Sequence, residues 1–156
     1  MAEVLFYHLE RARVEAVLPD LLEKTLQRGW RALVRAGDED SVQFLDEKLW
    51  TYRDESFLPH GIEGAEDKTA AHPILLTAKS STDGIPSSNA EILFAVEGAL
   101  LDPAEIQKFT RCVLIFNGAD EEALTTARGL WKDLRDTEHQ ATYWRQSEAG
   151  RWEKQG

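Results

Sequence analysis

Apolar positions along this chain fall into short continuous runs that alternate with longer stretches of helical spacing. The continuous runs are typical of buried strands: residues 3–9, 30–36, 73–78, 91–96, 111–116 and 140–145. The stretches with a period near 3.6 predict helices: residues 13–28, 38–51 and 120–136, with a shorter one at 102–108.

Several residues indicate where the first two helices begin and end. Pro19 lies inside the first helix, which therefore either begins there or is kinked. Gly29 follows as a C-terminal stop, and the acids at 38–40 suit the positive N-terminal end of the second helix. The inward stripe of the second helix consists of Val42, Leu45 and Leu49.

The order of these elements predicts the fold class. Strands alternate with helices in the first and last thirds of the chain, whereas no long helix separates the strands at 73–78 and 91–96. This predicts one three-layer α/β domain over residues 1–147, with a mixed, partly parallel sheet that includes an antiparallel neighbour. Residues 148–156 are expected to be a polar tail, and the polar stretches at 61–72 and 80–89 to be loops.

Charge and composition exclude several classes of function. The net charge is −10, with 28 acidic against 18 basic side chains, and proteins that grip a phosphate backbone usually show a basic face. Direct nucleic-acid binding is therefore not expected. No apolar run is long enough to span a membrane, and the N-terminus lacks the basic region of a signal peptide. The lone Cys112 predicts a buried, reduced thiol in the cytoplasm.

Motifs for catalysis or cofactor binding are missing from the sequence. It has neither a phosphate-binding G-x-x-x-x-G-K-[ST] nor a G-x-G-x-x-G, and the turn after the first strand contains no glycine. Neighbouring Asp46 and Glu47 diverge on their helix and form no carboxylate pair. The spacing typical of metal ligands is absent among the four histidines, His8, His60, His72 and His139. Neither a metal nor a cofactor is expected. A small nucleotide- or metabolite-dependent enzyme on an α/β domain is thus the weaker alternative.

The helix at 120–136 has two distinct stripes. Its inward stripe consists of Ala123, Ala127, Leu130 and Leu134. A second stripe, about 100° further round at 3.6 residues per turn, consists of Leu124, Arg128, Trp131 and Arg135, with Lys132 beyond it. Either Trp131 widens the core contact under two arginines, or it is an apolar shelf beside a guanidinium. The second arrangement suits a peptide that ends in an aromatic residue and a free carboxylate.

The stretch from residue 45 to residue 60 contains a second candidate surface. After Leu49 the helix should end, which leaves large apolar side chains in irregular chain: Trp50, Tyr52, Phe57, Leu58 and Pro59. Such side chains either fold back onto the core or form an exposed docking patch.

The same stretch carries a family resemblance. It reads L-D-E-K-L-W at 45–50 and F-L-P-H at 57–60, which resembles the signature segment of chi subunits of DNA polymerase III. The opening F-Y-H-L at 6–9 and the late A-R-G-L-W-K at 127–132 fit the same family in order. The resemblance extends along nearly the whole chain and is weakest over 61–89.

The resemblance implies a non-catalytic accessory subunit that links the replicase to single-stranded DNA-binding protein. Chi subunits bind the acidic, aromatic-ended C-terminal tail of that protein through an Arg and an aromatic residue, which map onto Arg128 and Trp131. Trp131 replaces the tyrosine of the family. A basic residue one turn earlier in the family is here Leu124, so that contact is missing or comes from Lys132 or Arg135.

A second partner is implied by the same resemblance. Chi subunits pair with the psi subunit of the clamp loader, and their psi-facing patch maps onto Trp50 and Phe57, with Leu58 and Pro59 beside it. The psi subunit or another clamp-loader component is therefore the expected partner at this surface.

Overall fold

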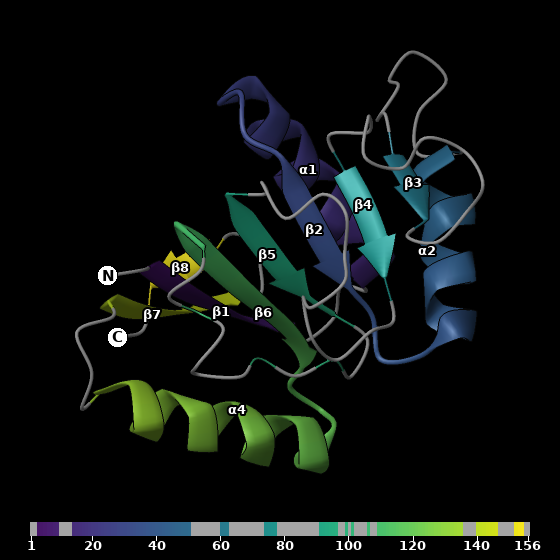
Figure 1. Cartoon of the computed structure of the whole chain (residues 1–156). Coiled ribbons are helices and arrows are strands. Elements are labelled where there is room, and N and C mark those ends of the chain that lie inside the picture. The colour runs from purple at the N-terminus through teal and green to yellow at the C-terminus, as the bar shows by residue number, and fades with distance from the viewer. Residues whose placement is uncertain are drawn as a thin grey trace.

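The structure is a computed structural model, and the elements it describes alternate along the chain (Figure 1). Described are residues 3–9, 14–50, 60–62, 74–77, 91–96, 99, 101, 106, 109–135, 140–146 and 152–154. The helices in these ranges are α1 (Val14–Gln27), α2 (Glu39–Trp50) and α4 (Glu121–Arg135). The strands are β1 (Glu3–Leu9), β2 (Ala32–Arg35), β3 (His60–Ile62), β4 (Ile74–Thr77), β5 (Ile92–Ala95), β6 (Arg111–Asn117), β7 (Gln140–Gln146) and β8 (Trp152–Lys154).

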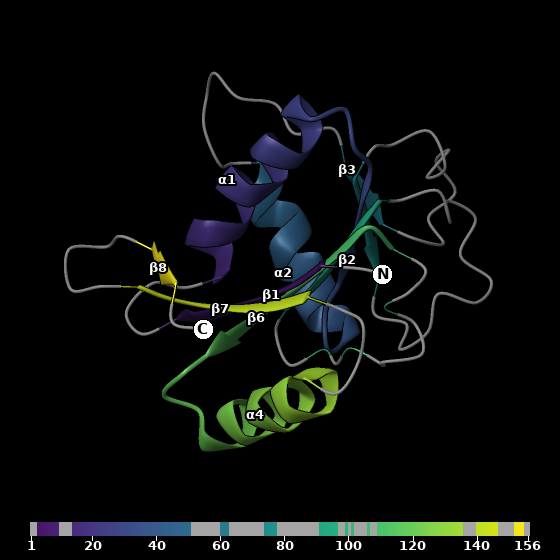
Figure 2. The ribbon, with the colours of Figure 1, turned by 90° about the vertical axis from the view of Figure 1, so that its left-hand side faces the viewer.

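These strands form one sheet in the order β3-β4-β2-β5-β6-β1-β7-β8. Each neighbouring pair is parallel except β7–β8, which is antiparallel. Figure 2 shows α1 and α2 on one face of the sheet and α4 on the opposite face. The predicted three-layer α/β fold with a mixed, partly parallel sheet is therefore confirmed, and most of the strand pairs are parallel.

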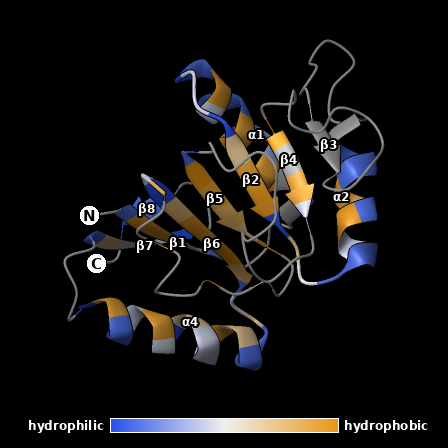
Figure 3. Cartoon of the chain, in the orientation of Figure 1, coloured by the Kyte–Doolittle hydropathy of each residue, from blue (hydrophilic) through white to orange (hydrophobic). Residues whose placement is uncertain are grey.

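Helices on both faces explain why the strands are continuous apolar runs. In β1, Leu5 and Leu9 belong to the core layer that contains residues of α1 and α2. Val4 and Phe6, which alternate with them, belong to the layer that contains residues of α4. Figure 3 shows β2, β4 and β5 largely in the colours of apolar residues. Cys112 of β6 is fully buried, as predicted.

The helix ends largely follow the sequence signals. Helix α1 runs through Pro19, so the alternative in which it begins at that proline is wrong. Gly29 has a φ of 79° and its N–H donates to the carbonyl of Leu26 at 2.9 Å, which confirms the predicted stop. The carboxylate of Asp38 accepts a hydrogen bond of 2.7 Å from the N–H of Ser41 and caps α2. This hydrogen bond lowers the pKa of Asp38.

Two of the strands were not predicted from the sequence. Strand β3 begins at His60, where irregular chain was expected, and pairs in parallel with β4. Strand β8 lies in the segment expected to be a polar tail, and it supplies the antiparallel pair of the sheet. The ring of Trp152 packs against Tyr7 with 4.9 Å between the centroids, at an interplanar angle of 81°. An aromatic contact therefore accompanies the backbone pairing of this short strand.

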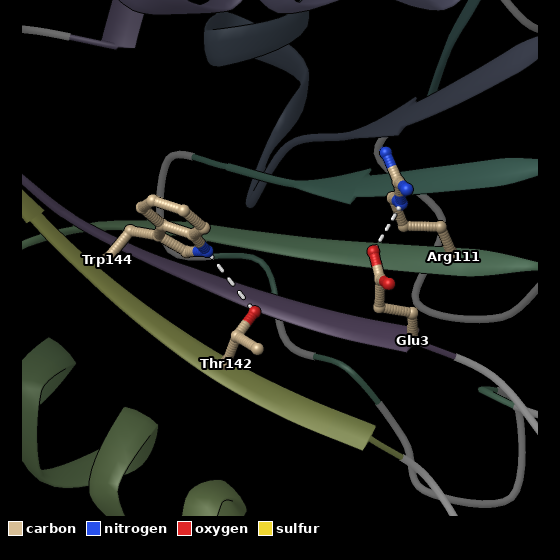
Figure 4. A network of polar contacts seen from close by, with 4 residues as sticks. All are labelled: Glu3, Arg111, Thr142 and Trp144. Carbon is tan, nitrogen blue, oxygen red and sulfur yellow. Dashed lines mark hydrogen bonds and ion pairs between the residues drawn. The ribbon is translucent and has the colours of Figure 1, made fainter. Parts of the chain in front are cut away.

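Polar contacts also link the strands. Glu3 and Arg111 are directly opposite one another at the start of β1 and β6, and their Oε1 and Nε atoms form an ion pair at 2.8 Å (Figure 4). On β7 the indole N–H of Trp144 donates to Oγ1 of Thr142 at 3.2 Å (Figure 4). The same indole stacks on Tyr7 at 6.5 Å and 18°. The ion pair thus joins β1 to β6, and the stacked rings of Tyr7 and Trp144 join β1 to β7.

Candidate functional site

Helix α4 has well-defined ends. The carboxylate of Asp120 accepts hydrogen bonds from the N–H groups of Glu122 at 3.0 Å and Ala123 at 3.3 Å, which caps the first turn. Basic Lys132 and Arg135 lie in the last turn, where the helix dipole favours positive charge. Capping and charge placement together explain why this segment is helical from Glu121 to Arg135.

The inward stripe predicted for α4 is confirmed. Ala127, Leu130 and Leu134 are buried in the core layer on this face of the sheet, and Ala123 packs against that layer while partly exposed. This burial fixes the rotation of the helix about its axis and hence the direction of its other side chains.

The second stripe lies at the edge of the buried face, as its spacing predicts. Leu124 and Trp131 are half-buried and pack against the same core layer. Arg128, Arg135 and neighbouring Lys132 are exposed. The structure therefore brings the five predicted residues together on one side of α4, with the apolar side chains inside and the cations outside.

Trp131 packs against two aromatic rings from the sheet. Its ring centroid lies 5.5 Å from that of Phe6 on β1, at 80°, and 5.9 Å from that of Tyr143 on β7, at 88°. Phe6 and Tyr143 are stacked on one another at 6.2 Å and 14°. Trp131 thus widens the core contact of α4, which was one of the two interpretations of its position. Part of its surface nevertheless stays exposed.

The cations around Trp131 have exposed side chains. Among the residues that the structure describes, no hydrogen bond or ion pair involves the side chain of Arg128, Lys132 or Arg135. Asp133 is the one acidic residue among the last eight of the helix, so this half of α4 is locally basic on an acidic chain. A half-buried aromatic ring beside exposed cations can bind an anionic group that adjoins an apolar one.

Sequence reasoning missed two residues of this region. Tyr143 and His8 lie in neighbouring strands, and the phenol oxygen of Tyr143 is 2.6 Å from Nδ1 of His8. The alternation of Phe6 and His8 on one face of β1 was visible in the sequence. Their approach to β7 was not, because strand order depends on pairings between distant segments.

The second candidate surface lies mostly beyond what the structure describes. Trp50 is the last residue of α2, and nothing is described of its side chain. Phe57, Leu58 and Pro59 lie outside the described residues altogether. Nearby on α2, Phe44 is 39% exposed and Nζ of Lys48 lies 5.4 Å from its ring centroid.

Within the described ranges, no group of three or more His, Cys, Asp or Glu residues is placed to hold a metal ion. No helix in the same ranges is long and apolar enough to cross a bilayer. The carboxyl ends of β1 and β6 are where parallel α/β sheets commonly bind ligands, because the chain leaves these strands toward opposite faces. Here the imidazole of His8 lies against Gly118 at that point.

Comparison with known protein families shows which family this chain belongs to. The family model described as "DNA polymerase III chi subunit, HolC" matches residues 1–142. The chain belongs to the chi subunit family of DNA polymerase III. The match includes β1, α2 and α4, so both candidate surfaces of this chi family member lie inside it.

A curated relative of this chi family chain carries the same description. It is the probable DNA polymerase III subunit chi of Rickettsia prowazekii, which is 24% identical over 108 residues. The alignment covers 69% of this chain and 59% of the relative, so the chain spans less than two thirds of that protein.

Solved structures share the fold at low identity. The C-terminal domain of S. cerevisiae Dbp5, in a structure with Gle1 and IP6, has a TM-score of 0.63 and 13% identity, and the match covers 92% of this chain and 90% of that domain. Another structure of the C-terminal domain of the DEAD-box protein Dbp5 has a TM-score of 0.60 and 14% identity, with 91% and 90% covered. At such identities the likeness shows the fold alone.

Proposed function

We propose that this chain is a non-catalytic chi subunit that links DNA polymerase III to single-stranded DNA-binding protein in the cytoplasm. It does so by binding the acidic C-terminal tail of that protein. The observation that carries the proposal is the half-buried Trp131 at the edge of α4, beside the exposed side chains of Arg128, Lys132 and Arg135.

The chemistry of these residues matches such a tail. The planar guanidinium of Arg128 offers paired donors to a terminal carboxylate. Trp131 offers ring surface to an aromatic side chain that precedes the carboxylate. Lys132 and Arg135 supply positive charge for further acidic residues, and they stand in for the basic residue that Leu124 replaces.

The charge distribution favours a peptide over a nucleic acid as the ligand. A net charge of −10 repels a long phosphate backbone, whereas a short acidic peptide needs only the local basic half of α4. This chain should therefore not shift single-stranded DNA in a gel at low salt when single-stranded DNA-binding protein is absent. A clear shift would indicate direct DNA binding in place of tail binding.

A titration with a synthetic tail peptide tests this function. The wild-type chain should bind a peptide with an aromatic end and a free carboxylate at about micromolar strength, and should bind its C-terminal amide more weakly. Arg128→Ala and Trp131→Ala should each weaken binding by ~2 kcal/mol or more, as for interface hot spots. Lys24→Ala removes one exposed cation from α1, on the opposite face, and should leave the affinity unchanged.

Two results of this titration would contradict the proposed site. If the peptide and its amide bind equally, the carboxylate contact of Arg128 is wrong. If neither Arg128→Ala nor Trp131→Ala changes the affinity while both variants keep their melting temperature, α4 is not the tail site.

The second partner in this proposal is the psi subunit or another clamp-loader component. Family membership supports partnership with other polymerase III components, and the candidate contact is the patch of Trp50, Phe57, Leu58 and Pro59. Co-purification with psi should be lost in Trp50→Ala and Phe57→Ala, and kept in Arg128→Ala. Conversely, the first two variants should keep tail binding, and equal retention of psi by all three would reject the patch.

A further inference from the structure

The aromatic ring beside Trp131 is itself held by a hydrogen bond. The phenol oxygen of Tyr143 and Nδ1 of His8 lie 2.6 Å apart, which joins β7 to β1 next to the proposed site. His8 is 7% exposed and Tyr143 is half-buried, so water has limited access to the bond. A short, sheltered hydrogen bond restricts how far the phenol ring can turn or shift.

His8 has little room to move. Its ring lies 5.2 Å from Phe116 at 57° and 5.8 Å from Tyr143 at 65°, measured between centroids. On a third side it meets the backbone at Gly118, where a Cβ atom would overlap the imidazole. Nδ1 of His8 is therefore a fixed point from which the hydroxyl of Tyr143 is held.

Tyr143 in turn defines where the ring of Trp131 can lie. The planes of these two rings are at 88° to one another. The ring of Phe6, which stacks on Tyr143, is at 80° to the plane of the indole. Perpendicular aromatic contacts are directional, because the positive edge of one ring faces the negative face of another. A change in the position of Tyr143 would therefore change the angle at which Trp131 presents its exposed surface.

We propose that His8 and Tyr143 are positioning residues of the peptide site, and that they set its preference for an aromatic residue at the end of the peptide. This inference rests on the proposed function. An aromatic side chain of the peptide must meet the ring of Trp131 at a suitable angle, whereas the carboxylates meet exposed cations on flexible side chains. Loss of positioning should therefore affect the aromatic end of the peptide and spare the acidic part.

Two variants, His8→Asn and His8→Leu, test this inference, because the Asn and Leu side chains have nearly the same shape as one another. Asn places a hydrogen-bonding atom the same number of bonds from Cβ as Nδ1, and Leu places a methyl group there. Tyr143→Phe removes the hydroxyl from the other side and keeps the ring, so it stays informative if His8→Leu fails to fold. Each variant is titrated with two peptides that differ only in the last residue, Phe or Ala, both with a free carboxylate.

Loss of one hydrogen bond should weaken binding of the Phe-ended peptide roughly three- to tenfold in both His8→Leu and Tyr143→Phe. The Ala-ended peptide should lose less than about twofold, since it has no ring to be placed. The His8→Leu/Tyr143→Phe double variant should lose no more than either single variant, because both remove the same bond. His8→Asn should stay within about twofold of wild type.

A purely structural role of His8 would give a different result. It would lower the melting temperature and weaken both peptides by the same factor, or leave both affinities unchanged, and either result overturns this inference alone. Failure of the wild-type chain to bind either peptide would reject the proposed function together with the inference. The wild-type titration thus separates the two claims.

Discussion

The ring of His8 occupies the space that a side chain at Gly118 would need. The N–H of Gly118 donates to the carbonyl of Leu9 at 2.8 Å, so the turn from β6 into α4 is held against the end of β1. Position 118 therefore requires glycine for lack of space, and the start of α4 depends on it.

Replacement of this glycine should destabilise the protein. In Gly118→Ala the new methyl group must push aside the imidazole ring or shift the backbone of the turn, because the ring is packed on its other sides. Overpacking of this kind costs ~1–3 kcal/mol of unfolding free energy. Chemical denaturation followed by circular dichroism measures the loss, and a change below about 0.5 kcal/mol, typical of an unstrained site, would show that the ring can move.

Gly129 offers a matched control for that substitution. It lies inside α4, and a Cβ atom there would meet nothing within 4 Å. Alanine costs less backbone entropy than glycine in a helix, so Gly129→Ala should raise the unfolding free energy by about 1 kcal/mol. A loss of stability in Gly129→Ala would mean that added methyl groups harm this region for a reason other than the contact with His8.

The sequence predicted the local part of the fold well. Apolar runs and helical spacing reflect which residues are buried, and Glu3–Leu9 is a strand as predicted while α4 is within one residue of its expected ends. The missed strands are three residues each. Such strands carry too few positions for periodicity to show, and they depend on partners: β8 on its pairing with β7 and on the ring of Tyr7.

The candidate site was predictable only within its helix. The stripe of Leu124, Arg128 and Trp131 follows from 100° per residue and needs no knowledge of the rest of the chain. The contact of Trp131 with Tyr143 joins α4 to β7, and the hydrogen bond to His8 spans 135 residues in sequence. Only the strand order, with β1 between β6 and β7, brings these three side chains together.

Alkaline pH should reveal the environment of Tyr7. Burial raises the pKa of its phenol above the usual 10.0, with an opposing effect of Arg111 and a smaller raising effect of Glu3. The unfolded chain therefore loses this proton at a lower pH than the folded chain. The resulting stabilisation is complete below a pH of about 10 and is lost as pH rises through the folded pKa.

Tyr7→Phe isolates that contribution. The difference in unfolding free energy between wild type and variant should be constant from about pH 7 to 9 and should shrink above about pH 10, since the variant has no phenol to titrate. Other groups that titrate in this range cancel in the difference. Parallel curves for the two proteins up to pH 11 would contradict a raised pKa.

Salt should weaken tail binding through the cations of α4. Exposed charges are screened over about 10 Å at 0.1 M salt and about 3 Å at 1 M, so the affinity of an acidic tail peptide should fall steadily over this range. Arg128→Ala should flatten that dependence, because it removes one of the charges that produce it. Lys24→Ala, which removes a charge from the other face of the sheet, should keep the wild-type slope. If the slopes of all three proteins are equal, the guanidinium of Arg128 does not contact the acidic peptide, and any salt dependence comes from other cations such as Lys132 and Arg135.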